Sequence, residues 1–193
     1  MIICVYGSAS DRIDQKYKTA AYALGKEMAR RGHDLVYGGG ALGVMGAVAR
    51  GVKDGGGRVI GVLPEFFKET HAEQLNYDCD ELIWCQTMHE RKSIMEEKAS
   101  AFVIAPGGIG TFDEFFSVLT QKQLGRHDKP ITLFNVAGVY DGFNAVFANA
   151  YKERFINGEC AAMLRSFTDV AALLDYIESD EPYSYNKTNL KDG

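Results

Sequence analysis

Two short segments of the sequence combine charged side chains with the predicted start of a helix. The first is Met88–Lys92, with the sequence MHERK, and the second is the glycine-rich run Pro106–Glu114. Cations in the first turn of a helix oppose its macrodipole, at a cost of roughly 0.3–1 kcal/mol each. A local rule broken without evident compensation is typical of a functional site, so we predict that Arg91 and Lys92 face a ligand. A guanidinium suits phosphate or a pair of sugar hydroxyls.

The second segment has the composition of a phosphate-binding loop. Gly107, Gly108 and Gly110 leave bare backbone amides at a helix N-terminus, and Thr111 adds a hydroxyl. Such amides bind phosphate monoesters because they point outward at the positive end of the helix dipole. No Gly-Lys-Ser/Thr follows, which excludes a Walker loop.

The carboxylate that ends this segment has two interpretations. Thr111 and Glu114 have the spacing of a capping box, which explains Glu114 without any chemistry. However, Glu114 also lies on the helix that would bind phosphate, near the Arg91 segment. We therefore predict that Glu114 acts on a bound nucleotide. Asp113 should point about 100° away around the helix, so that only one of the two carboxylates faces the site.

A second glycine-rich loop follows a predicted strand at Tyr37. Gly38, Gly40 and Gly43 formally match the GxGxxG dinucleotide fingerprint, and Gly39 lies among them. The fingerprint normally follows the first strand of its unit, whereas this loop follows the second, so we favour a phosphate or ribose site over a whole dinucleotide. The alternative is that these glycines serve only tight packing between helix and sheet.

Two further features have plainer explanations. Gly7 and Ser8 follow the first predicted strand and suit contact with phosphate or sugar, but an ordinary turn is the slightly favoured interpretation of this loop taken alone. Thr87 and Glu90 have capping-box spacing, and we favour that interpretation of Glu90 over catalysis.

The elements that would position these residues alternate along the chain. Apolar runs predict strands at Ile2–Tyr6, Asp34–Tyr37, Arg58–Leu63, Glu81–Cys85, Ala101–Ala105 and Pro130–Asn135. Helical spacing predicts helices over Asp14–Arg31, Gly43–Asp54, Met88–Ala99, Phe112–Leu124, Tyr140–Phe155 and Thr168–Ser179, and residues 64–80 form an irregular excursion.

This alternation predicts an α/β fold: a doubly wound, Rossmann-like parallel sheet with helices on both faces. We expect a single domain over residues 1–179, followed by a polar tail at 180–193. In such a sheet ligands bind at the carboxyl ends of the strands, where all of the loops above begin.

Composition narrows the function further. The chain has 193 residues, a formal net charge of −5 and four cysteines without CxxC or Cys/His clustering. We therefore expect no nucleic-acid or acidic-membrane partner, no disulfide framework and no metal site. The sequence has neither a signal peptide nor an apolar run long enough to cross a bilayer, so the cytoplasm is the expected location.

The two charged segments resemble a known family. The pattern Met-His-x-Arg-Lys at Met88–Lys92, followed by Pro-Gly-Gly-x-Gly-Thr-x-x-Glu at Pro106–Glu114, is similar to the LONELY GUY family of cytokinin riboside 5′-monophosphate phosphoribohydrolases. Members of this family are often described as possible lysine decarboxylases. The similarity extends from Ile2 to about Leu174, and it includes the glycine loop at Gly38–Gly40.

The resemblance implies a Rossmann-like homodimer with active sites near the dimer interface. It implies cleavage of AMP, or of an N6-substituted analogue, to free base and ribose 5-phosphate, without a metal or organic cofactor. The family's catalytic arginine and glutamate correspond to Arg91 and Glu114. With the loop positions described above, the candidate substrate-binding residues are Gly7, Ser8, Gly38, Gly39, Gly40, Met88, Lys92, Gly107, Gly108, Gly110 and Thr111.

Three other functions are compatible with parts of the sequence. A non-catalytic nucleotide or molybdenum-cofactor carrier of the same fold is the main alternative, and the pair of Arg91 and Glu114, which a carrier does not need, distinguishes the two. An NAD-dependent oxidoreductase ranks third. A pyridoxal-dependent lysine decarboxylase ranks last, because no lysine stands out as a Schiff-base partner. The preferred base stays open.

Overall fold

A parallel sheet forms the centre of the computed structural model, which describes residues 1–70, 74–158, 160 and 163–179. Its strands are β1 (Ile2–Tyr6), β2 (Asp34–Tyr37), β3 (Val59–Pro64), β4 (Glu81–Cys85), β5 (Ala101–Ile104), β6 (Ile131–Phe134) and β7 (Arg165–Phe167). Within the described residues these seven strands lie in the order β4-β3-β2-β1-β5-β6-β7, and each neighbouring pair is parallel.

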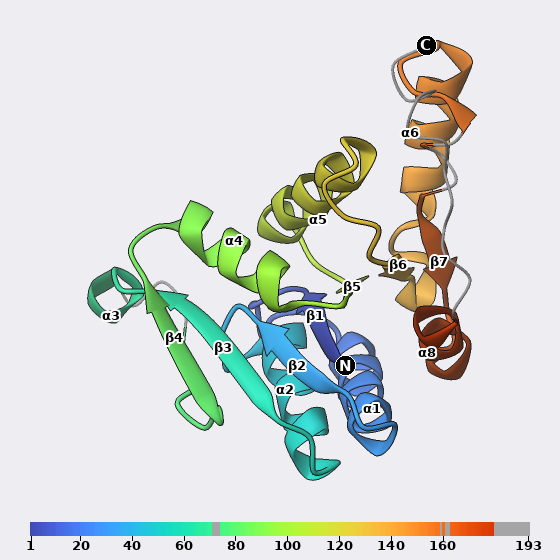
Figure 1. Cartoon of the computed structure of the whole chain (residues 1–193). Helices are drawn as coiled ribbons and strands as arrows, with labels where there is room; N and C mark the ends of the chain where they lie inside the picture. The colour runs from blue at the N-terminus through green and yellow to red at the C-terminus, as the bar shows by residue number, and fades with distance from the viewer. Residues whose placement is uncertain (71–73, 159, 161–162, 180–193) are drawn as a thin grey trace.

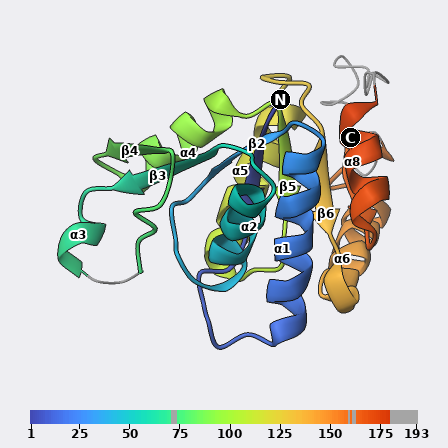
Figure 2. The same cartoon turned by 90° about the horizontal axis from the view of Figure 1, so that it is seen from below.

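Helices cover both faces of the sheet (Figure 1). They are α1 (Gln15–Arg30), α2 (Gly43–Asp54), α3 (Phe67–Thr70), α4 (Met88–Lys98), α5 (Ile109–Gln123), α6 (Asp141–Lys152) and α8 (Val170–Glu178), with a 3₁₀ turn η1 at Val136–Gly138. Helices α1, α2 and α8 pack on one face, and α4 and α5 pack on the other (Figures 1 and 2). The predicted doubly wound parallel sheet is thereby confirmed.

A layer of apolar core lies on each face of the sheet, and alternate residues of a strand point into one layer or the other. In β1, Ile3 and Val5 belong to the cluster with α1, α2 and α8, whereas Cys4 and Tyr6 belong to the cluster with α4 and α5. A strand buried on both faces must be apolar at every position, which is why these strands are continuous apolar runs in the sequence.

The main differences from the sequence prediction lie in β7, α3 and the start of α5. Strand β7 was not predicted, because it is only three residues long and two of them, Arg165 and Ser166, are polar and exposed at the sheet edge. Helix α3 lies inside the predicted excursion at 64–80. Helix α5 begins at Ile109, not at Phe112. The predicted tail at 180–193 lies outside the described residues.

The sheet has one topological switch point. From β1 the chain adds β2, β3 and β4 on one side, and it then returns to place β5 on the other side of β1. The carboxyl ends of β1 and β5 therefore meet where the strand order reverses, which is the position where open α/β sheets bind ligands. Among the described residues, no helix has the length and apolar character needed to cross a membrane.

Candidate active site

A cavity of about 270 Å³ opens at this switch point, beside the N-termini of α4 and α5. It is lined by Gly7, Ser8, Ala9, Met45, Met88, Arg91, Gly108, Ile109, Gly110, Thr111, Asp113 and Glu114. The structure thus brings together most of the predicted site residues, from three separate segments. The predicted residues outside the lining are Gly38, Gly39, Gly40, Lys92 and Gly107.

The loop after β5 leaves open space above the first turn of α5. Gly108 caps this helix without a side chain, and a Cβ added at Gly108 or Gly110 would meet nothing within 4 Å. A Cβ at Gly107, in contrast, would lie 2.0 Å from the hydroxyl oxygen of the buried Thr111. Gly107 therefore allows Thr111 to take its place in the lining, while the next two glycines leave amides accessible to an anion.

A buried tyrosine fixes the position of this loop. The Tyr140 hydroxyl donates to the carbonyl oxygen of Ala105 at 2.6 Å, and the amide of Ser8 donates to the carbonyl oxygen of Pro106 at 3.0 Å. Burial raises the pKa of Tyr140, so its hydroxyl remains a proton donor at neutral pH. The loops after β1 and β5 are thereby held together along one wall of the cavity.

Glu114 lies in the second turn of α5 and lines the cavity, although it is only 9% exposed. Because α5 begins at Ile109, both Thr111 and Glu114 are inside the helix, and the capping box proposed for them does not form. Capping of the helix therefore does not explain the presence of a glutamate at position 114.

Asp113 lines the same cavity, so the prediction that only one of the two carboxylates would face it is wrong. The Asp113 carboxylate contacts Lys92 of α4, and this contact between two helices draws the aspartate to the side of α5 that adjoins the cavity. Ala9, Met45 and Ile109 were also missed as lining residues. For Ile109 a signal was available, because a bulky apolar residue is unusual within a glycine-rich loop.

The start of α4 is capped as the sequence predicted. The Thr87 hydroxyl accepts a hydrogen bond from the Glu90 amide at 3.1 Å, and the Glu90 carboxylate accepts one from the Gln86 amide at 2.7 Å. Glu90 is thus explained by capping. The cap fixes the first turn of α4 and with it the direction of the next residue, Arg91.

Arg91 is a buried cation held by backbone carbonyls. It is 3% exposed, its Nε donates to the carbonyl oxygen of Val62 at 3.2 Å, and its Nη2 donates to that of Gly38 at 2.6 Å. Within the described part of the chain its guanidinium makes no ion pair. Burying a charge without an opposite charge is costly, and this arrangement therefore suits a site that receives an anion.

The glycine loop after β2 supports Arg91 from outside the cavity. A Cβ at Gly38 would lie 1.8 Å from Nη2 of Arg91, so only glycine leaves room for the guanidinium at this position. Gly39 has a φ of +75° and lies against Leu63. The structure thus places this loop where it orients Arg91, and it does not bring Gly38–Gly40 into the lining.

Lys92 joins the two helices at the site. Its Nζ lies 3.0 and 2.9 Å from the two carboxylate oxygens of Asp113. Lys92 itself is not part of the cavity lining, although the preceding residue, Arg91, is. This ion pair between α4 and α5 was not predicted.

The chain matches the family described as possible lysine decarboxylase over residues 45–177. It is 43% identical to the cytokinin riboside 5′-monophosphate phosphoribohydrolase LOG of Oryza sativa subsp. japonica, over 93% of this chain and 74% of that protein. It is 37% identical to the phosphoribohydrolase LOG2 of Arabidopsis thaliana, over 93% of this chain and 84% of that protein.

Solved structures with a similar fold include molybdenum-cofactor proteins. The molybdenum cofactor carrier protein of Chlamydomonas reinhardtii superposes with a TM-score of 0.69 at 25% identity, covering 92% of this chain and 95% of that chain. The molybdenum cofactor binding protein of Rippkaea orientalis has a TM-score of 0.70 at 24% identity, covering 92% and 94%. The second likeness concerns the fold alone.

Proposed function

The chain belongs to the same family as the cytokinin riboside 5′-monophosphate phosphoribohydrolases, and from that premise we propose that it is a hydrolase of nucleoside 5′-monophosphates. The reaction is cleavage of the N-glycosidic bond of AMP, or of an N6-substituted analogue, to free base and ribose 5-phosphate. One observation carries the proposal: Arg91 and Glu114 line the same cavity as the open amides at Gly108–Gly110.

Each part of this cavity has a role in the proposed mechanism. The cleavage passes through an oxocarbenium-like ribose, and the Glu114 carboxylate stabilises that cation or activates the attacking water. Arg91 holds the ribose phosphate or assists the departing base. The amides at Gly108 and Gly110 and the Thr111 hydroxyl bind the 5′-phosphate, so that binding energy away from the reacting bond orients the sugar.

A carrier of the molybdenum-cofactor type is the alternative, supported by the likeness of fold. The higher identity to the phosphoribohydrolases favours the enzyme. A carrier also has no need of an arginine buried without a carboxylate beside a glutamate in the same cavity.

A cytoplasmic homodimer without a metal or organic cofactor completes the proposal. The homodimer is supported, besides the family, by the apolar surface of α5 and α6: α6 buries none of its residues, and Phe116, Val146 and Tyr151 are exposed. Exposed apolar side chains grouped on neighbouring helices are typical of a protein interface. Light scattering should give about twice the mass of one chain.

The test is a panel of nucleoside 5′-monophosphates assayed for release of free base. We expect base release from AMP or an N6-substituted AMP by the wild type, and a loss of roughly 10²–10⁴-fold in the Glu114→Gln variant, which keeps the shape of the side chain without its charge. Undiminished release by Glu114→Gln would remove this residue from the mechanism. No release from any member of the panel would remove the function.

A further inference from the structure

The charges around the cavity are unfavourable for the ligand that it is proposed to take. Among the described residues of the lining, the charged ones are Arg91, Asp113 and Glu114, which leaves a net charge of minus one when both carboxylates are ionised. A phosphate monoester carries about −1.5 to −2 charges at pH 7. A cavity of this charge would repel its own substrate unless another cation offsets one carboxylate.

Lys92 lies where it can provide that offset. Its ammonium contacts both carboxylate oxygens of Asp113 at 2.9–3.0 Å. The lysine side chain is 17% exposed and the aspartate side chain is 61% exposed. Asp113 lines the cavity and Lys92 does not, so the contact with Asp113 is the route by which the ammonium can act on the charge of the lining.

We infer that Lys92 is a charge-compensating residue that acts through Asp113: it cancels the negative charge at the wall of the cavity so that the phosphate group can enter. This role differs from direct contact between lysine and phosphate. It rests on the proposed function for the identity of the ligand.

The dimensions of the site make the effect measurable. A cavity of about 270 Å³ is about 8 Å across if it is roughly spherical, so any charge on its wall lies within about one Debye length of a bound anion. At such separations an unscreened unit charge in a partly aqueous environment changes anion affinity by about tenfold.

The experiment compares Lys92→Met, Asp113→Asn and the double variant in the full-length chain. The readouts are kcat and KM for AMP and the inhibition constant of inorganic phosphate. In Lys92→Met we expect KM and the phosphate inhibition constant to rise together by about tenfold, with kcat within about twofold of the wild type. In Lys92→Met/Asp113→Asn both constants should return close to the wild-type values, because the exposed negative charge is gone.

Two control variants separate the charge of Lys92 from the shape of its side chain and from the general loss of an ion pair. Lys92→Arg keeps the cation and should resemble the wild type. Lys53→Met breaks an ion pair of the same kind, with 2.9 Å between its Nζ and an oxygen of Asp80, but away from the cavity, and it should change neither constant. Thermal melting of each variant confirms that it is folded.

Two results would overturn the inference. If the double variant keeps the full defect of Lys92→Met, then the lysine touches the phosphate itself. If Lys92→Met has wild-type constants, then the charge of Asp113 does not matter. A wild type that releases no base from any nucleotide would instead defeat the proposed function. In that case dissociation constants for inorganic phosphate in the same variants still decide the role of Lys92.

Discussion

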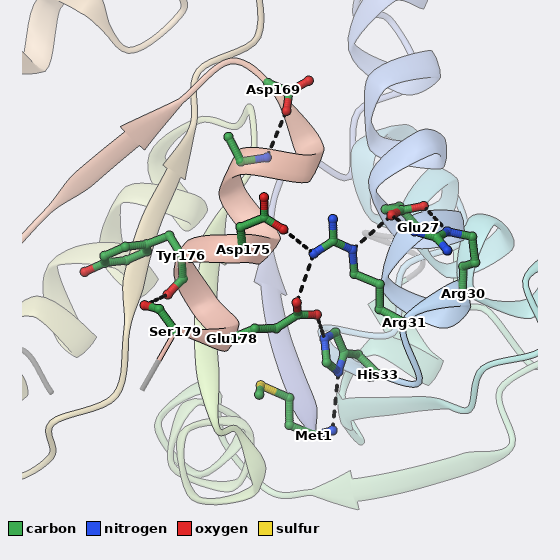
Figure 3. Close-up of polar contacts among 11 residues, drawn as sticks. Met1, Glu27, Arg30, Arg31, His33, Asp169, Asp175, Tyr176, Glu178 and Ser179 are labelled. Carbon is green, nitrogen blue, oxygen red and sulfur yellow. Dashed lines mark hydrogen bonds and ion pairs between the residues drawn. The ribbon is translucent and has the colours of Figure 1, made fainter. Parts of the chain in front are cut away.

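Two arginines in this chain are surrounded in opposite ways. Arg31, which follows α1, donates to the carboxylates of Glu27, Asp175 and Glu178 at 2.7–2.9 Å (Figure 3). Arg91, in the first turn of α4, is held by backbone carbonyls and, within the described residues, by no carboxylate. The first lies in a network that ties α1 to α8, and the second lies in the wall of the cavity.

The two arginines differ in how much of their positive charge is compensated by neighbouring carboxylates. Three carboxylates more than neutralise the charge of Arg31, so its function is to join elements that are distant in the sequence. Carbonyl dipoles fix the orientation of the Arg91 guanidinium but cancel none of its formal charge. An arginine that is held by carbonyls and has no carboxylate partner remains available to an anion. We take this arrangement at Arg91 as the feature that distinguishes the candidate active site.

The Arg31 network is anchored further by a histidine. The imidazole Nε2 of His33 lies 2.6 Å from a carboxylate oxygen of Glu178, and its Nδ1 lies 3.4 Å from the amine of Met1 (Figure 3). Helix α8 thus contacts the end of α1 through several polar side chains as well as through its apolar face.

Within the comparison of the two arginines, the largest expected effect comes from Arg91→Lys. The substitution keeps the charge but removes the planar fork of donors that the carbonyls of Gly38 and Val62 orient. We expect base release from AMP to fall by roughly 10²–10³-fold, with the free energy of unfolding changed by less than about 1 kcal/mol. Steady-state kinetics and urea unfolding measure the two. A large loss of stability with normal kinetics would make Arg91 a structural residue like Arg31.

Gly38→Ala should have a smaller effect of the same kind. The new methyl group would occupy the position of Nη2 and displace the guanidinium without removing it, so we expect kcat/KM to fall by about tenfold. Gly142→Ala is the matched control, because a Cβ there meets nothing within 4 Å, and it should leave the kinetics unchanged. Equal activity of the two variants would show that the loop does not position Arg91.

Arg31→Met should show the opposite profile. The substitution removes the cation that the carboxylates of Glu27, Asp175 and Glu178 share, and we expect a loss of about 1–3 kcal/mol in the free energy of unfolding. Because the network is remote from the cavity, kcat and KM at 25 °C should be unchanged. A loss of activity without a loss of stability would contradict the division between the two arginines.

The smallest effect is a pH dependence of the Arg31 network. Hydrogen bonds from Arg30 and Arg31 lower the pKa of Glu27 to about 2. A carboxyl whose folded-state pKa is lowered stabilises the protein above its unfolded pKa of about 4.3, and this contribution is lost as pH falls towards 2. The stability difference between wild type and Glu27→Gln should be about 1 kcal/mol at pH 7 and should shrink between pH 5 and pH 3. A difference that is constant with pH would contradict this assignment.

The sequence alone predicts the strands and helices whose residue pattern is set within one continuous segment. The predicted bounds of β1, β2 and β4 match the structure. Strand β1 shows the reason most clearly, because a run buried on both faces is apolar throughout. Strand β7 has no such run, and α3 is a single turn, too short to show a helical period.

The same limit applies to the site: residues marked by a local signal could be predicted, and contacts between distant segments could not. Arg91, Gly108 and Gly110 were found from local signals, a misplaced cation and a glycine run at a helix start, and all three line the cavity. The contact of Arg91 with Gly38, 53 residues away, and that of Lys92 with Asp113, 21 residues away, depend on how separate elements meet. No single segment encodes those contacts, and the orientation of Asp113 was predicted wrongly for that reason.

The most direct test of the whole account is a single-turnover reaction with the protein in excess over AMP, for wild type and Glu114→Gln side by side. We predict that the wild type converts each AMP to one adenine and one ribose 5-phosphate, whereas Glu114→Gln binds AMP and returns it intact. Recovery of intact AMP from wild-type protein to which it had bound would contradict the account and identify a carrier.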